Sequence, residues 1–146
     1  MRVEIKRFEE LSKTELYNML QLRSEVFVVE QNCVYQDIDG KDAKAWHVLG
    51  KVDGAIVAYS RIFNAGDYFE TSSIGRVVVA EPHRKKGYAK KIMEEAMAYI
   101  HRSLNEKKIT LSAQTYLTQF YNDLGFSQEG DGYLEDGIPH IRMVSG

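Results

Sequence analysis

The sequence predicts a single domain of the α+β (or α/β) class, residues 1–146, built on a sheet of mixed strand direction. Strand-like and helix-like segments alternate along the chain, which is typical of this class. Asp53-Gly54 lies between two apolar runs and predicts an antiparallel hairpin early in the chain. A length of 146 residues fits one domain, and no repeat or Pro/Ser-rich linker divides it.

The first half of the chain predicts one strand, one helix and the hairpin. Ser12, followed three residues later by Glu15, forms a capping-box signal for a helix N-terminus. The apolar stripe of that helix runs through Leu16, Met19, Leu20, Val26 and Phe27. The expected segments are a strand over 1–8, a helix after Ser12, a loop over 36–44, and strands over 45–51 and 55–63.

The second half contains the clearest helix, from Gly87 to about Leu104, with apolar residues recurring at helical spacing. Gly125 ends a shorter helix. The expected segments are a strand over 74–80, helices over 87–104 and 117–124, and strands over 109–113, from Phe126 onward, and over 140–144.

Composition excludes several classes of protein. Nineteen basic and 21 acidic residues give a net charge of −2, which disfavours a nucleic-acid partner. The single cysteine, Cys33, excludes an internal disulfide framework, and no ligand cluster predicts a metal site. No apolar run approaches the ~20 residues of a membrane span, so we expect no membrane partner and a cytoplasmic location.

A basic, glycine-containing turn joins the predicted strand 74–80 to the long helix. Arg84, Lys85 and Lys86 stand where the helix dipole disfavours positive charge, and Gly87 follows them. Unpaired N–H groups at a helix start bind anions, so the turn predicts a phosphate-bearing ligand. It matches neither the P-loop nor the dinucleotide motif. The alternative is that the basic residues are merely solvated and the glycine only forms a turn.

Five motifs in order resemble one family. The pattern Arg84-x-x-Gly87-x-Ala89 resembles the acetyl-CoA-binding motif of the GNAT acetyltransferase superfamily, and Tyr121-x-x-x-Gly125-Phe126 resembles its later motif. Residues 22–32, 35–40 and 136–141 resemble the ElaA-like branch of that superfamily. The resemblance implies a mostly antiparallel central sheet of about six or seven strands flanked by about four helices. It also implies acetyl transfer from acetyl-CoA to an amine of a small-molecule or peptide acceptor, by direct attack in a ternary complex.

The resemblance further implies where acetyl-CoA, the cosubstrate, would bind. The backbone of the strand would hydrogen-bond the pantetheine arm, and the backbone of the following turn would hold the pyrophosphate. The residues expected to bind it are Val77, Val78, Val79, Arg84, Lys85, Lys86, Gly87, Tyr88, Ala89 and Lys90.

Three residues are candidates for catalysis. The resemblance implies that Tyr121 lies near the thioester sulfur and hydrogen-bonds the departing thiolate. His140 is the first candidate for the base that deprotonates the amine, since imidazoles accept protons near neutral pH. Glu30 is the competing base, acting directly or through water. A structural role for each side chain, packed in the core or at a strand start, is the alternative.

Three further residues are candidates for acceptor binding. Arg23 and Glu30, seven residues apart, fall on the apolar stripe of the first helix, where a charged group is costly unless it is paired or binds a ligand. Arg76 raises the same question because it shares a strand face with Ile74 and Val78, and Gln114, just after the strand 109–113, could hydrogen-bond the substrate or be an ordinary polar loop residue. Two arginines at one pocket would favour an acceptor with a carboxylate or phosphate. The alternative is that each charge pairs within the protein.

Other functions remain open from the sequence. The chain could be a non-catalytic module that senses CoA or acyl-CoA, or an acyltransferase that uses a carrier-bound donor. RNA binding through residues 84–91, with Tyr88 stacking on bases, is opposed by the net charge. The sequence leaves open whether the protein forms a homodimer.

Overall fold

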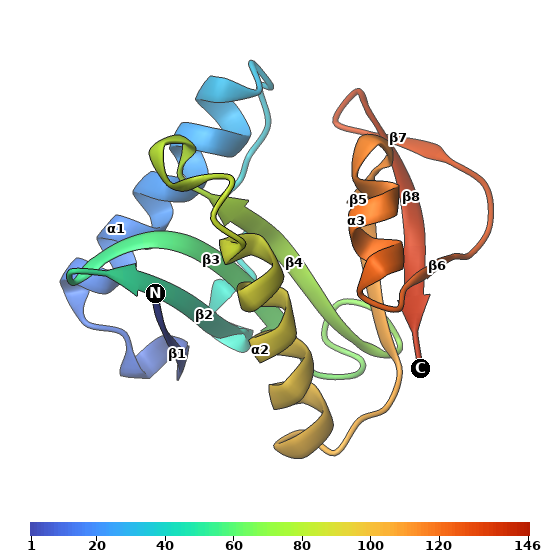
Figure 1. Ribbon diagram of the computed structural model, residues 1–146, viewed down its shortest axis with the longest axis horizontal. Helices are drawn as coiled ribbons and strands as arrows, with labels where there is room; N and C mark the ends of the chain where they lie inside the picture. The colour runs from blue at the N-terminus through green and yellow to red at the C-terminus, as the bar shows by residue number, and fades with distance from the viewer.

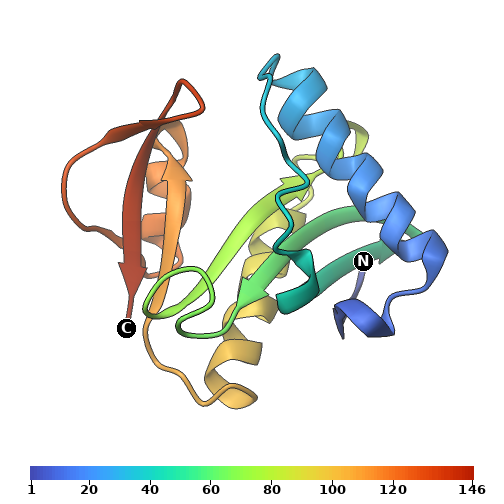
Figure 2. The same cartoon turned by 180° about the vertical axis from the view of Figure 1, so that it is seen from behind.

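The computed structural model describes all residues, 1–146, and its centre is one open sheet (Figures 1 and 2). The strands are β1 (Arg2–Arg7), β2 (Trp46–Val52), β3 (Ala55–Phe63), β4 (Ser72–Val79), β5 (Ile109–Gln114), β6 (Ser127–Gln128), β7 (Tyr133–Glu135) and β8 (Ile138–Ser145). The helices are α1 (Lys13–Arg23), continued by a π-helical segment (Ser24–Glu30), α2 (Tyr88–Arg102) and α3 (Thr118–Asp123).

The sheet is split in the middle. Its strand order is β1-β2-β3-β4-β5-β8-β6, with β7 paired to β8, and every pair is antiparallel except β4 with β5. That parallel pair is joined only where Ser72 and Ser73 face Ile109 and Thr110. Beyond this point β4 and β5 diverge, and the two halves of the sheet form a V (Figure 1).

Helices cover both faces of the sheet. α2 and α3 lie on the face toward the viewer in Figure 1, and α1 lies on the face seen in Figure 2. Successive residues of a strand point to opposite faces of the sheet, and each face has its own hydrophobic core. Val48 and Ala58 pack under α2, whereas Leu49 and Tyr59 pack under α1. The core under α2 includes four residues of that helix, Ile92, Met93, Ala96 and Ile100.

The predicted fold class and the mostly antiparallel sheet are confirmed. The structure adds strand β7, so the sheet has eight strands, and it contains three α-helices and the π-helical segment. The capping box at the start of α1 is present, with the Glu15 N–H donating to Ser12 Oγ at 3.0 Å. None of the helices combines the length and apolar character needed to cross a membrane.

The first helix differs from its prediction after Arg23. Winding changes there from α to π, which takes more residues per turn. Two positions that are seven residues apart therefore no longer lie on the same face of the helix. Arg23 is fully buried, whereas Glu30 is exposed. The expectation that the two charges share one face of a helix is wrong for this reason.

Candidate active site

Strand β4 carries a bulge at the mouth of the V. Gly75 pairs with Arg61 and Val78 pairs with Tyr59, so β4 has one more residue than β3 between these pairs. Arg76, within the bulge, has a left-handed backbone with φ 53°. A bulge of this kind leaves a residue unpaired and bends the strand away from its ladder. Main-chain groups of β4 thus become available to a ligand lying in the split.

The turn before α2 forms a cradle of main-chain donors. Lys85 (φ 65°) and Gly87 (φ 77°) both adopt left-handed conformations, and no side chain caps the helix. The first hydrogen bond of the helix is from the Lys91 N–H to the Gly87 carbonyl, so the preceding N–H groups lack helical partners. A Cβ at Gly87 would meet nothing within 4 Å, which shows open space over these donors. The cradle fits a pyrophosphate.

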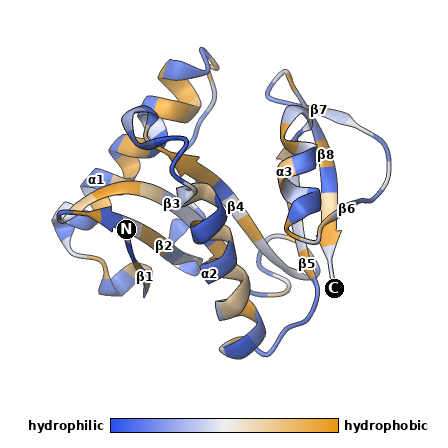
Figure 3. Cartoon of the chain, in the orientation of Figure 1, coloured by the Kyte–Doolittle hydropathy of each residue, from blue (hydrophilic) through white to orange (hydrophobic).

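A groove of about 350 Å³ runs from this cradle along β4 to α3. It is lined by every residue that the sequence predicts to contact acetyl-CoA except Lys86. Figure 3 shows the hydrophilic turn meeting the apolar end of β4, and the lining of the groove accordingly places Lys85 and Lys90 beside Val77–Val79. This polarity suits a ligand with a phosphate end and a less polar arm.

Arg84 and Glu30 form a pair within the groove. The guanidinium reaches the two Glu30 carboxylate oxygens at 2.7 and 2.8 Å and donates to the Val79 carbonyl at 3.0 Å. Hydrogen bonding from Arg84 lowers the pKa of Glu30. Glu30 does not line the second cavity described next, so the structure separates it from the residues around His140.

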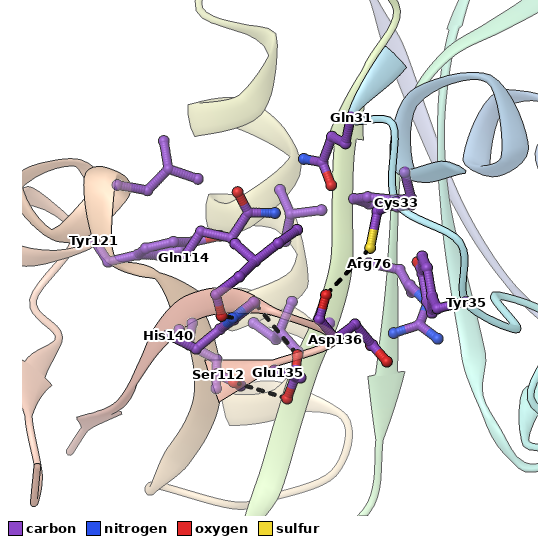
Figure 4. A pocket seen from close by; sticks show the side chains of 17 residues that line it. Gln31, Cys33, Tyr35, Arg76, Ser112, Gln114, Tyr121, Glu135, Asp136 and His140 are labelled. Atoms are coloured by element: carbon purple, nitrogen blue, oxygen red, sulfur yellow. Dashed lines mark hydrogen bonds and ion pairs between the residues drawn. The ribbon is translucent and has the colours of Figure 1, made fainter. Parts of the chain in front are cut away.

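A second cavity, of about 110 Å³, lies between β4 and the β5–β8 half of the sheet. It contains His140, Arg76 and Gln114 among its lining residues (Figure 4). It meets the groove at residues that line both, which are Phe27, Gln31, Val77, Gln114, Leu117 and Tyr121. The two cavities are therefore two arms of one site.

Tyr121 stands at this junction. Its ring is 5% exposed and packs edge-on against Phe120 and Phe126, with centroids 5.0 and 6.1 Å away. Burial raises the pKa of the Tyr121 phenol, and the nearby Tyr116 acts in the same direction. The hydroxyl makes no hydrogen bond within the protein. It is a protonated donor without a partner, at the place where the two cavities meet.

His140 lies on β8 directly across from Gln114 of β5. Its Nδ1 is 2.7 Å from the Ile138 carbonyl oxygen, and because a carbonyl only accepts, Nδ1 carries a hydrogen. Nε2 therefore holds the lone pair in the neutral ring. It faces Glu135 Oε2 at 3.3 Å, and the Tyr133 ring stacks on the imidazole.

Arg23 does not line either cavity, which corrects its prediction as an acceptor-binding residue. Its buried guanidinium pairs with Asp37 at 2.9 Å and Asp42 at 2.8 Å, so the alternative of internal pairing holds. Arg76 does line the second cavity, but its Nε lies 2.8 Å from Asp37 Oδ1, close enough for an ion pair although the N–H is not aligned for a hydrogen bond.

Sequence reasoning missed part of the site. The loop residues Cys33 and Tyr35 and the β7–β8 hairpin residues Glu135 and Asp136 all line the second cavity (Figure 4). A hydrogen bond from Cys33 Sγ to the Asp136 carbonyl, at 3.5 Å, joins the two segments across 103 positions of sequence. The one available signal was the polar hairpin before His140, whose Asp136-Gly137 pair marks a turn.

Comparison with known proteins agrees with this geometry. Residues 9–145 match the family model described as "Acetyltransferase (GNAT) domain". The fold and this match define the class of acyl-CoA N-acyltransferases. The chain belongs to the GNAT acetyltransferase family, and within it is an ElaA-like protein.

Three known proteins illustrate the similarity. Protein ElaA of Escherichia coli is 44% identical over 137 residues, covering 92% of this chain and 90% of ElaA; its crystal structure superposes with a TM-score of 0.92, covering 99% of each chain. An acyl-CoA N-acyltransferase from Pseudomonas aeruginosa is 38% identical with a TM-score of 0.93, covering 100% of both chains. A GNAT family acetyltransferase from Elizabethkingia anophelis, solved with acetyl-CoA bound, shares the fold at 14% identity and a TM-score of 0.66, covering 98% of this chain and 97% of its own.

Proposed function

We propose that the protein transfers an acetyl group from acetyl-CoA to an amine of a small-molecule or peptide acceptor, by direct attack in a ternary complex. The observation that carries this proposal is the junction of the two cavities. A donor in the groove and an acceptor in the second cavity would meet beside the unpartnered Tyr121 hydroxyl and Gln114. Holding both reactants there in one orientation supplies much of the rate.

The groove residues fit the donor in the order of its parts. N–H groups at Lys85–Lys90 would hold the pyrophosphate, and the main chain at Val77–Val79 would hold the pantetheine arm. Acetyl-CoA, when bound, supplies an acyl group already activated as a thioester. We assign Arg84 and Glu30 to the wall of the groove, because each satisfies the charge of the other.

The second cavity supplies the proton transfers. His140 Nε2 takes the proton that the attacking amine loses, and the neighbouring Glu135 carboxylate stabilises the resulting imidazolium. As the new C–N bond forms and the C–S bond breaks, the Tyr121 O–H donates a hydrogen bond to the departing sulfur. A hydrogen bond that strengthens as charge develops lowers the barrier without full proton transfer, which suits a phenol whose pKa is raised.

Two alternatives keep the groove and change the role. A module that only senses acyl-CoA would bind it without needing Tyr121 or His140. An enzyme that uses a carrier-bound donor would have little affinity for free acetyl-CoA. Both are separated from the proposal by titrating the protein with acetyl-CoA and by measuring transfer to amines.

The first test is calorimetric titration of Gly87→Glu with acetyl-CoA. A carboxylate at Gly87 would enter the open space above the donor cradle and repel the pyrophosphate, so we expect binding to weaken by about a hundredfold or more. Gly54→Glu is the matched control: Gly54 also has a positive φ, 81°, and open space around it, but it lies in the β2–β3 turn. Undiminished binding by the Gly87 variant would refute the assignment of the cradle.

A further inference from the structure

The charges around the second cavity do not favour an anionic acceptor. Three arginines and three aspartates form one largely buried cluster of mutual ion pairs, consisting of Arg23, Arg61, Arg76, Asp37, Asp39 and Asp42. Three positive and three negative charges cancel within it. Arg76 is the member that lines the cavity, and its charge is balanced by Asp37 at 2.8 Å and Asp39 at 3.5 Å, although its Nε–H makes no hydrogen bond. The predicted preference for a carboxylate or phosphate therefore loses its basis.

The remaining charges that line the cavity are carboxylates. Glu135 and Asp136, on the β7–β8 hairpin, have no arginine or lysine paired with them. The Glu135 side chain is 44% exposed, so an incoming ligand can reach it, and Ser112 Oγ fixes it by donating to Oε1 at 3.2 Å. The cavity thus presents an oriented negative charge at its wall.

When His140 is neutral, no hydrogen lies between its Nε2 and the facing Glu135 Oε2. Because Nδ1 of His140 carries the ring proton, the neutral imidazole presents a lone pair at Nε2, and the facing Glu135 Oε2 is also an acceptor. The two atoms are 3.3 Å apart, and the His140 side chain is only 8% exposed. In that state a cationic donor can bridge both acceptor atoms. The NH3⁺ group of an alkylammonium has three donors and a positive charge.

We propose that the acceptor binds as a protonated amine, held between Glu135 Oε2 and His140 Nε2, and that Glu135 is the residue that selects cationic acceptors. This inference rests on the proposed function. The bound ammonium passes one proton to Nε2, and the neutral amine then attacks the thioester. As the C–S bond breaks, the second proton passes from the nitrogen to the departing CoA thiolate, which leaves the amide and CoA, and the imidazolium stays paired with Glu135. Amines that carry a carboxylate close to the amino group are repelled by Glu135 and Asp136.

The test uses acceptors of one length and different charge. Protein saturated with CoA, which cannot react, is titrated calorimetrically with n-butylamine, 1,4-diaminobutane and 4-aminobutanoate. We expect both net-cationic amines to bind at least about tenfold more tightly than 4-aminobutanoate, because all three offer the same ammonium group and only 4-aminobutanoate brings a carboxylate toward Glu135 and Asp136. Glu135→Gln should remove most of that difference. Glu95→Gln, on the exposed face of α2, is the matched control and should keep it.

Each outcome decides the inference. Equal binding of 4-aminobutanoate, no binding of any amine, or an unchanged preference in Glu135→Gln would overturn it. The CoA titration that precedes the amines tests the proposed function separately. Failure to bind CoA would refute the groove assignment, whereas normal CoA binding without amine selectivity would refute only the role of Glu135.

Discussion

Among single residues, Tyr121 combines burial with an unused hydrogen-bond donor. Packing against Phe120 and Phe126 holds the ring in place whether or not the hydroxyl is present. Removing only the oxygen therefore separates a catalytic role from a structural one. We expect Tyr121→Phe to lower kcat by about a hundredfold, the low end of what one lost transition-state donor costs.

The affinity of the Tyr121→Phe variant for acetyl-CoA distinguishes a catalytic role of the hydroxyl from a role in binding the donor. Acetyl-CoA binding by Tyr121→Phe should stay close to that of the parent protein, because the hydroxyl acts on charge that develops only during reaction. Tyr17→Phe, 72% exposed on α1, is the control and should change neither quantity. If Tyr121→Phe turned over at the parent rate, the tyrosine would be a packing residue.

Arg23 illustrates the cost of a buried charge that loses its partner. Arg23→Met leaves Asp37 and Asp42 short of one guanidinium in a buried setting, and both carboxylates are less than a tenth exposed. Breaking such a pair costs about 3–5 kcal/mol of unfolding free energy. Urea unfolding measures the loss, with Arg102→Met at the exposed end of α2 as the control. A loss comparable to the control would show that water or Arg61 replaces the missing partner.

At the scale of the elements, Glu15 ties α1 to the first strands. Its carboxylate lies 2.9 Å from Lys6 Nζ on β1 and 2.7 Å from Lys51 Nζ on β2, and it accepts from the Ser12 N–H. Burial acts to raise the pKa of Glu15, but the hydrogen bonds from Lys51, Ser12 and Lys6 together lower it to about 2. The folded state therefore favours the ionised carboxylate.

This shift predicts how stability depends on pH. A depressed pKa in the folded state contributes stability above the unfolded value, about 4.3, and that contribution is lost as the pH falls toward about 2. Urea unfolding of the parent protein should thus show a larger loss between pH 5 and pH 3 than unfolding of Glu15→Gln. Glu25→Gln, at an exposed and unpaired position, should follow the parent. Parallel curves for the parent and Glu15→Gln would contradict the assignment.

Local patterns predicted the elements that depend on local forces. The capping box at Ser12, the Asp53-Gly54 hairpin and the apolar face of α2 each involve residues close together in sequence, and all three are present. The burial of Arg23 depends instead on residues far away in the sequence. Arg23 reaches partners 14 and 19 residues away, and no helical periodicity contains that information.

Across the whole molecule, the two arms of the site differ in whether their residues are close together or far apart in the sequence. One wall of the groove follows a continuous stretch, from β4 through the turn into α2, so a motif in the sequence could indicate it. Glu135 reaches His140 only through the β7–β8 hairpin, and Cys33 reaches Asp136 across most of the chain. Such residues come together by folding, and the sequence predicted His140 and Gln114 without the carboxylate beside them.

The V in the sheet has a consequence for how this architecture can change over time. One arm offers mainly main-chain groups, which persist when side chains are exchanged, provided that the bulge and Gly87 keep their conformation. The other arm is walled in part by side chains of the segments 33–35 and 135–138, which lie outside the helices. Substitutions there can give the enzyme a new acceptor while the machinery for the donor stays intact. Diversification of substrate use can therefore proceed by drift in two short segments.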